Sequence, residues 1–287
     1  MKLLVNTVTV DEGAFLNMPI VDTSLALCVM NIADFDAVKN KLLKLYGDVA
    51  VQTESGESTI SELSGAKEIF VAAQTDFAKR RYNAADALRV IARLTLPEGG
   101  CPWDRAQTHD SIRINMIEEA YEAVDAINKR DVPNMREEFG DVFLQSILQS
   151  DIAKRAGEFD FDDVCDELCK KLISRHTFIF GDDSAGNPDE ALNLWEKAKA
   201  TEKNYDSAKT QLQKLPETFP ALLYCQKTIK KMGKAGVKYD ADKELAAALE
   251  AGDYVSAVCA CVAKLLEVGA DAEVEVCKKV KSMIESL

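Results

Sequence analysis

Two short stretches of the 287-residue sequence carry acidic residues at helical spacing. The first is Glu118, Glu119 and Glu122 in EEAYE, and the second is Glu138 and Asp141 in EEFGD. A helix advances by about 100° per residue, so Glu119 and Glu122 lie within about 60° of each other, as do Glu138 and Asp141. Each pair therefore presents two carboxylates on one helix face.

The sequence RDVP at 130–133 is expected to fold the second acidic helix back beside the first. Four carboxylates then converge on one point. They belong to Glu119, Glu122, Glu138 and Asp141. Such an oxygen-only, highly charged group suits a hard cation such as Mg²⁺, with Mn²⁺ as a substitute. Without a cation the group would repel itself.

The segment after Asp141, VFLQSILQS, is apolar on nearly all sides apart from Gln145 and Gln149, so Asp141 is expected on a buried helix. The alternative is that these acids are ordinary helix-surface residues that form local salt bridges with neighbouring Lys and Arg side chains. The absence of any basic residue from 137 to 153 favours the metal site.

Composition and charge exclude several functional classes. With 35 Lys+Arg against 48 Asp+Glu, the net charge of −13 opposes binding to nucleic acid or to anionic membranes. No apolar run of about 18 residues occurs, so no membrane-spanning segment is expected. Eight cysteines without a C-x-x-C pair, and only two histidines, argue against a zinc site and favour a reduced, cytoplasmic protein.

The pattern of the chain changes near residue 82. Residues 1–82 alternate β-branched runs (LLVNTVTV, LALCVMNI, EIFVAA) with a helical pattern at 34–46, which predicts a small α+β unit, and the polar stretch 53–64 is expected to be a loop. Beyond it the chain is expected to be almost entirely helical. Helices are predicted near 83–94, 109–129, 134–156, 161–176, 188–204, 217–234 and 254–267, with a last one at the C-terminus.

Five blocks between about 98 and 204 carry a family resemblance: GGCPWDRAQTHDSIR, EEAYE, EEFGD, KKLISRHTFIFGD and NLWEKAKATEK. In this order they resemble the MazG-type nucleoside triphosphate pyrophosphohydrolases. The resemblance implies an all-α helical bundle, Mg²⁺-dependent cleavage of an NTP to NMP and pyrophosphate, and a homodimer. By position, Glu119, Glu122, Glu138 and Asp141 match the metal ligands, and Glu118 is the candidate for orienting or deprotonating the attacking water.

Cations are also needed, because a triphosphate brings about four negative charges. Lys171 and Arg175 lie at i and i+4 on one helix face, and Trp195 and Lys199 repeat that spacing on the next helix. All four match substrate-contacting blocks of the family. Taken alone, the two cations could be a solvated basic face near a helix C-terminus, and Trp195 could either stack on a base or fill the core.

Three further residues lie in or after the predicted CPWD turn. Trp103, Asp104 and His109 combine an aromatic ring with polar groups that could hold a nucleobase edge. A loop anchored by a hydrophobic Trp103 is an equally fair interpretation.

The two ends of the chain suggest degenerate domains, which gives three predicted domains, 1–82, 83–210 and 211–287. The first resembles the tail of a tetrapyrrole methylase domain and is too short to hold that domain. In the last, LPETFPALLYCQKTIKKMGKAGVKYD resembles the start of a second MazG-like copy. This copy retains Glu250 and Asp253 but no E-E-x-x-E, so a catalytically silent packing or dimerisation segment is predicted. The alternative is that EAGD occurs at a helix start by chance.

The sequence therefore predicts a mainly α protein with a small α+β N-terminal unit. The predicted function is Mg²⁺-dependent NTP pyrophosphohydrolysis in the house-cleaning of nucleotide pools. The alternative is a non-catalytic helical dimerisation or regulatory module. The intact five-acid motif favours the enzyme, because a module without catalysis has no physical reason to keep mutually repelling carboxylates.

Overall fold

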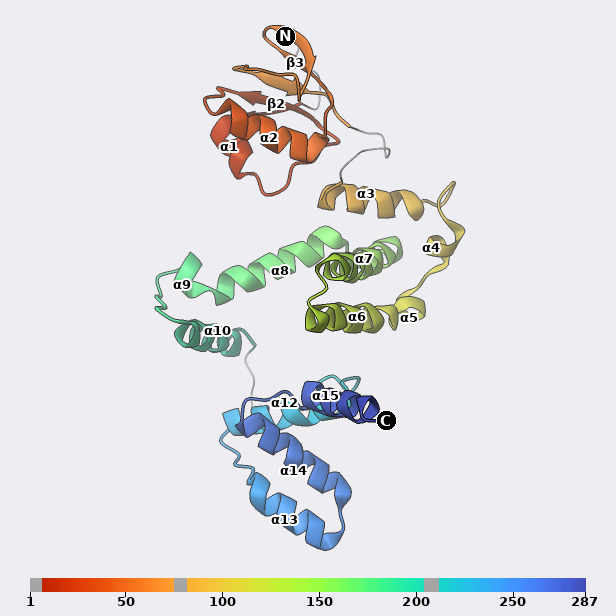
Figure 1. Ribbon diagram of the computed structural model, residues 1–287, viewed down its shortest axis with the longest axis vertical. Helices are drawn as coiled ribbons and strands as arrows, with labels where there is room; N and C mark the ends of the chain where they lie inside the picture. The colour runs from red at the N-terminus through yellow and green to blue at the C-terminus, as the bar shows by residue number, and fades with distance from the viewer. Residues whose placement is uncertain (1–6, 75–81, 204–211) are drawn as a thin grey trace. The chain divides into compact units, whose positions relative to one another are not determined.

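The computed structural model describes residues 7–74, 82–203 and 212–287 (Figure 1). The chain divides into two compact units, Met1–Cys169 and Lys170–Leu287. The described part is mainly helical with one small sheet, which confirms the predicted fold class. Residues 3–6 of the first predicted strand and residue 204 of the predicted helix at 188–204 lie outside the described residues.

The N-terminal part of the first unit is a five-stranded sheet in the order β1-β2-β5-β3-β4, with β1 and β2 parallel and the other pairs antiparallel. The helix α2 supplies Val38, Leu42 and Tyr46 to its core, at the i, i+4 and i+8 spacing of one helix face. The elements of this part are β1 (Thr7–Asp11), α1 (Glu12–Asn17), β2 (Ala26–Met30), α2 (Phe35–Tyr46), β3 (Ala50–Thr53), β4 (Gly56–Thr59) and β5 (Ile69–Val71).

The prediction of a loop over 53–64 is wrong, because β4 lies within it and pairs with β3 as a hairpin. β4 is the edge strand of the sheet, and its four residues lack the apolar alternation that marks a half-buried strand. The buried residues of this stretch, Ile60 and Leu63, come after the strand. The pattern therefore gave no signal for β4.

Each predicted helical range contains a helix, but the helix predicted at 109–129 is divided in two, and the helices at 102–106, 177–180 and 241–251 were not predicted. Within the first unit the helical part begins with α3 (Ala84–Leu94), α4 (Pro102–Ala106), α5 (His109–Ile112), α6 (Asn115–Lys129) and α7 (Val132–Ala156). The later helices are α8 (Phe161–Arg175), α9 (Thr177–Phe180), α10 (Pro188–Lys203), α12 (Ala221–Lys234), α13 (Ala241–Ala251), α14 (Tyr254–Glu267) and α15 (Ala272–Glu285). No helix among the described residues is long and apolar enough to cross a bilayer.

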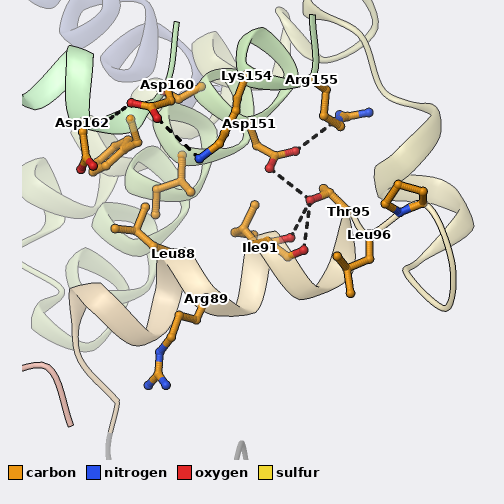
Figure 2. A pocket seen from close by; sticks show the side chains of 15 residues that line it. Leu88, Arg89, Ile91, Thr95, Leu96, Asp151, Lys154, Arg155, Asp160 and Asp162 are labelled. Carbon is orange, nitrogen blue, oxygen red and sulfur yellow. Dashed lines mark hydrogen bonds and ion pairs between the residues drawn. The ribbon is translucent and has the colours of Figure 1, made fainter. Parts of the chain in front are cut away.

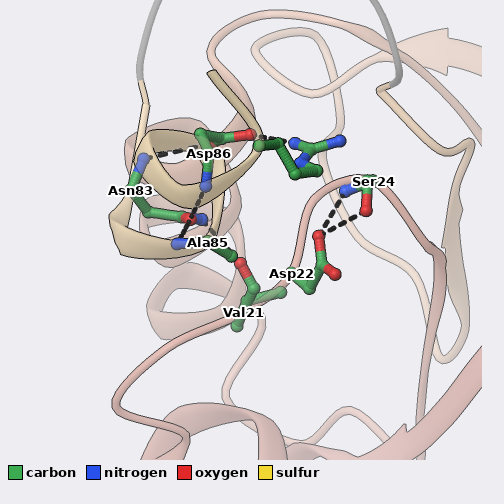
Figure 3. A network of polar contacts seen from close by, with 7 residues as sticks. Val21, Asp22, Ser24, Asn83, Ala85 and Asp86 are labelled. Carbon is green, nitrogen blue, oxygen red and sulfur yellow. Dashed lines mark hydrogen bonds and ion pairs between the residues drawn. The ribbon is translucent and has the colours of Figure 1, made fainter. Parts of the chain in front are cut away.

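A polar network fixes the start of α3 (Figure 3). The Asn83 side chain caps the helix by accepting from the backbone N–H of Ala85 at 2.9 Å and of Asp86 at 3.2 Å. Its amide nitrogen also donates to the carbonyl of Val21 at 2.6 Å. Asp86, which is 2% exposed, forms an ion pair with Arg89. This network ties α3 to the segment that follows α1.

The two acidic helices, α6 and α7, are joined by a short turn at Arg130 and Asp131. Arg130 ends α6 in the left-handed conformation with φ 55°, and Asp131 caps α7 by accepting from the Asn134 N–H at 3.2 Å. Pro133 lies in the first turn of α7, where a missing N–H leaves no bond unmade. α6 and α7 pack against each other, as predicted for the RDVP segment.

The hairpin of α13 and α14 in the second unit uses the same turn chemistry. Gly252 ends α13 at φ 68°, and Asp253 caps α14 by accepting from the Ser256 N–H at 3.0 Å. Asp253, one of the two acids that the sequence retains here, therefore has a capping role. The assignment of 211–287 as a degenerate copy stays a prediction, as do the other domain boundaries.

The Gly-Gly pair before α4 has a steric cause. Gly99 has φ +71°, which favours glycine, and a Cβ at Gly100 would lie 2.4 Å from the Leu96 carbonyl oxygen and 2.5 Å from that of Leu94. The Cys101 N–H donates to the same Leu94 carbonyl at 2.6 Å. The turn therefore returns the chain closely against the end of α3.

We expect Gly100→Ala to lower the free energy of unfolding by about 1–3 kcal/mol, because the added methyl meets backbone that cannot move aside. Gly140→Ala is the matched control. It lies inside α7 with nothing within 4 Å of its added Cβ, so it should gain about 0.5–1 kcal/mol. Urea unfolding of both variants measures the difference, and equal stabilities would contradict the steric argument.

Candidate functional site

The acidic site lies between α6 and α7. Glu119 and Glu122 of α6 and Glu138 of α7 each offer a carboxylate oxygen, and these oxygens all lie within 4.8 Å of one another. Glu138 is buried, Glu119 is half-buried and Glu122 is exposed. The structure thus brings three of the predicted ligands together from two helices.

The other two predicted acids lie beside this group of three. Asp141 is half-buried, three residues after Glu138 on α7, and its charge raises the pKa of both Glu119 and Glu138. Glu118 is exposed in the first turn of α6. Neither Asp141 nor Glu118 belongs to the group of three whose carboxylate oxygens lie within 4.8 Å of one another, so the roles predicted for these two acids stay predictions.

The electrostatics of the site disfavour three ionised carboxylates by themselves. Burial raises the pKa of Glu119 most, followed by the charges of Asp141 and Glu122. Burial likewise raises the pKa of Glu138, followed by the charges of Glu122 and Asp141. A divalent cation would offset this repulsion, and an all-oxygen donor set suits Mg²⁺ or Mn²⁺. The residues present therefore fit a hard cation.

Two glutamines extend the same face of α7. Gln145 is 6% exposed and hydrogen-bonds to Glu119. One turn further on, the Gln149 side chain is hydrogen-bonded to the His109 ring, whose other nitrogen lies 3.8 Å from Glu158. His109, a predicted substrate residue, is therefore held against α7. The sequence signal for these glutamines was that they interrupt an apolar run.

The neighbourhood of Trp103 differs from the predicted loop. Residues 102–106 form the short helix α4, and the Trp103 side chain is exposed at 60%. The Gln107 amide donates to the Trp103 carbonyl at 2.7 Å. Asp104 is half-buried in the same helix. An exposed ring is not a buried anchor, which leaves the indole face open to a ligand.

The predicted cations and the second tryptophan lie in the second unit. Arg175 is 6% exposed, and its guanidinium donates from Nε to Glu202 at 2.8 Å and from Nη2 at 3.3 Å. The same guanidinium lies 5.4 Å from the ring centroid of Trp195, and the His176 ring lies 4.7 Å from it. Lys171 is exposed and Lys199 is half-buried.

Glu202 was missed from the sequence. Its partner Arg175 lies 27 residues earlier, so no local spacing could have indicated the pair. The bidentate contact shows that the Arg175 fork already accommodates a planar anion. The half-buried Trp195 is therefore packed against a paired cation rather than against an apolar core.

A separate cavity of about 480 Å³ lies between α3, α7 and the start of α8 (Figure 2). It is lined by apolar side chains, among them Leu88, Ile91 and Ile147, and by charged ones. Arg155 pairs with Asp151 at 3.0 Å, and Lys154 pairs with Asp160 at 3.5 Å. None of the predicted site residues lines this cavity.

The fold and the site define a class of protein: a mainly helical protein with a group of carboxylates between the two helices of a hairpin. Residues 107–180 match the family profile described as "MazG nucleotide pyrophosphohydrolase domain". This segment contains α6 and α7 with all five predicted acids. Residues 107–180 are therefore similar to the MazG family, which confirms the resemblance inferred from the sequence.

Two relatives illustrate the similarity. The "Nucleoside triphosphate pyrophosphohydrolase" of Escherichia coli K12 is 38% identical over 149 residues, covering 52% of this chain and 57% of that protein. The "Nucleoside triphosphate pyrophosphohydrolase/pyrophosphatase MazG" of Thermotoga maritima is 42% identical over 118 residues, covering 41% of this chain and 44% of that protein. The chain thus spans about half the length of these relatives.

Among solved structures, the "mazG-related protein from Thermotoga maritima" is similar with a TM-score of 0.35 and 25% identity. The match covers 40% of this chain and 97% of that one.

The raised pKa values predict how stability depends on pH. A carboxyl whose folded pKa exceeds its unfolded value stabilises the fold at low pH, and this contribution is lost as pH rises through the folded pKa. In EDTA, we therefore expect Glu138→Gln to be more stable than wild type at pH 7, with the difference shrinking toward pH 4.

Thermal unfolding of both proteins between pH 4 and pH 8 provides the measurement. Taking the difference between variant and wild type removes the titration of the other acids. A variant less stable than wild type at pH 7 would contradict the assigned repulsion.

Proposed function

We propose that the protein is a Mg²⁺-dependent nucleoside triphosphate pyrophosphohydrolase, which converts an NTP and water to NMP and pyrophosphate. The observation that carries this proposal is the convergence of Glu119, Glu122 and Glu138 inside the segment that matches the MazG domain. The names of the relatives support the same reaction. Its biological role would be the house-cleaning of nucleotide pools.

The acids of α6 and α7 would hold the cation, with Asp141 completing the set. When bound, Mg²⁺ supplies charge neutralisation of the triphosphate oxygens and activation of a water. Glu118 would orient or deprotonate the attacking water, which adds to one phosphorus of the α–β anhydride. The anhydride bond then breaks, and the released oxygen leaves on the pyrophosphate or the NMP.

Cations of the second unit would bind the phosphates. Lys171 is exposed, whereas the Arg175 guanidinium is already paired with the Glu202 carboxylate. A phosphate group is tetrahedral but can offer two acceptor oxygens to a guanidinium group, as a carboxylate does, so it would replace or share this contact. The other residues that we propose to contact the substrate are Trp103, Asp104, His109, Trp195 and Lys199.

The direct test is pyrophosphate release from a panel of NTPs and dNTPs, with Mg²⁺ or EDTA, and with NMP separated from NDP. We expect metal-dependent NMP and pyrophosphate. Glu119→Gln and Asp141→Asn should each reduce turnover more than about 100-fold, since even groups that only support a ligand cost 10–100-fold. Glu250→Gln, at an exposed acid of α13, is the matched control and should retain activity.

Two outcomes would contradict this proposal. Normal turnover in both ligand variants would remove the metal-site assignment. No turnover across the panel, together with no metal binding, would favour the non-catalytic helical module.

A homodimer and a reducing, cytoplasmic location belong to the same proposal. The eight cysteines are free thiols, in keeping with a reducing compartment. Helix α6 and the residue before it expose apolar side chains at helical spacing, and α7 exposes further apolar side chains. They include Ile114, Ile117, Tyr121, Val124, Phe139 and Val142.

We expect sedimentation velocity to show twice the 31.6 kDa chain mass. Tyr121→Glu should shift this species toward the monomer, because it places a charge among these exposed apolar side chains. Val255→Glu, at an exposed apolar residue of α14, is the control and should leave the dimer intact. A wild-type monomer at all micromolar concentrations would contradict the proposal.

A further inference from the structure

Gln145 occupies a position where packing alone would favour an apolar residue. It lies on α7 four residues after Asp141 and seven after Glu138, on the helix face that carries both acids. It is 6% exposed, and Ile147 and Leu148 of the same helix are buried in the neighbouring core. A buried polar side chain requires partners for both ends of its amide.

Only one end of this amide has a partner among the described residues. The Gln145 side chain acts as a hydrogen-bond donor toward the Glu119 carboxylate across the α6–α7 pair, and this lowers the pKa of Glu119. An ionised carboxylate only accepts hydrogen bonds, so the Nε2 group must face Glu119. The Oε1 atom then faces away, and it is buried without a hydrogen-bond donor in the part of the chain that the structure describes.

The unsatisfied oxygen is destabilising, and the fold tolerates it. Methionine has nearly the same length and shape and would remove this cost. The amide must therefore be retained for what its nitrogen does, and the atom that its nitrogen contacts belongs to the group of three carboxylates. Unpaired buried groups of this kind recur where function competes with stability.

We propose that Gln145 is a positioning residue, which holds the Glu119 carboxylate toward the oxygens of Glu122 and Glu138 so that a divalent cation meets preorganised ligands. This inference rests on the proposed function, since it assigns a role within the same metal site. Groups that orient a metal ligand through a hydrogen bond contribute substantially to metal affinity. Gln145 acts through Glu119 and needs no contact with substrate.

The test is Mn²⁺ binding to the substrate-free full chain, followed by electron paramagnetic resonance of free Mn²⁺, with thermal unfolding in EDTA measured on the same samples. For Gln145→Met we expect Mn²⁺ affinity to fall about 10–100-fold while the unfolding midpoint stays equal to or above that of wild type. A purely structural residue would not give this opposite pair of changes.

Two further variants serve as controls for the role of the Gln145 amide. Gln145→Asn keeps a polar amide but withdraws it by one methylene, so Mn²⁺ affinity should fall here too. Leu148→Met repacks a buried position of the same helix and should leave Mn²⁺ affinity within about twofold of wild type.

The outcomes separate this inference from the function on which it rests. If wild type binds no Mn²⁺, the metal site and the proposed function fail together. If wild type binds Mn²⁺ and Gln145→Met binds it equally well, the positioning role is overturned while the proposed function stands. If Gln145→Met loses affinity only together with its stability, Gln145 is a structural residue and the inference is also overturned.

Discussion

The mutual repulsion of carboxylates between α6 and α7 is the constraint on which the site depends. Three acidic side chains have oxygens within 4.8 Å of one another, and burial and neighbouring charge raise the pKa of Glu119 and Glu138. Such a group is a net cost to the folded chain unless a cation balances it. The structure around the site holds these acids in place despite that cost.

The α6–α7 turn and the length of α7 supply this support. The turn at Arg130 and Asp131 fixes the register of the two helices, so that the acids of α6 stay beside those of α7. Beyond the acids, α7 continues into the apolar core with Ile147, Leu148 and Ile152. Burial of these residues stabilises the helix that carries Glu138.

The α13–α14 hairpin provides an internal contrast within the same chain. It has a left-handed residue followed by an aspartate cap at its turn, as α6–α7 has. Its buried residues, however, are alanines and one valine: Ala241, Ala248, Ala257, Ala260, Val262 and Ala263. Two helices can thus pack closely through alanine without any repulsion, which shows that the acids of α6 and α7 are not needed for a helical hairpin.

Much of this site could be predicted from the sequence, because helical periodicity determines which acids share a face. The pairing of Glu119 with Glu122, and their meeting with Glu138, follow from spacing and a short turn. The partners of Arg175 and His109 could not be predicted, since Glu202 and Gln149 are distant in sequence. The strand β4 was missed because an edge strand with polar residues has no periodic signal.

Anomalous X-ray scattering from crystals grown with Mn²⁺ tests the central claim most directly. The account predicts an anomalous peak coordinated by Glu119, Glu122 and Glu138, with Asp141 at or near the ion. A structure in which Mn²⁺ is absent from this point, while the three carboxylates remain together, would contradict it.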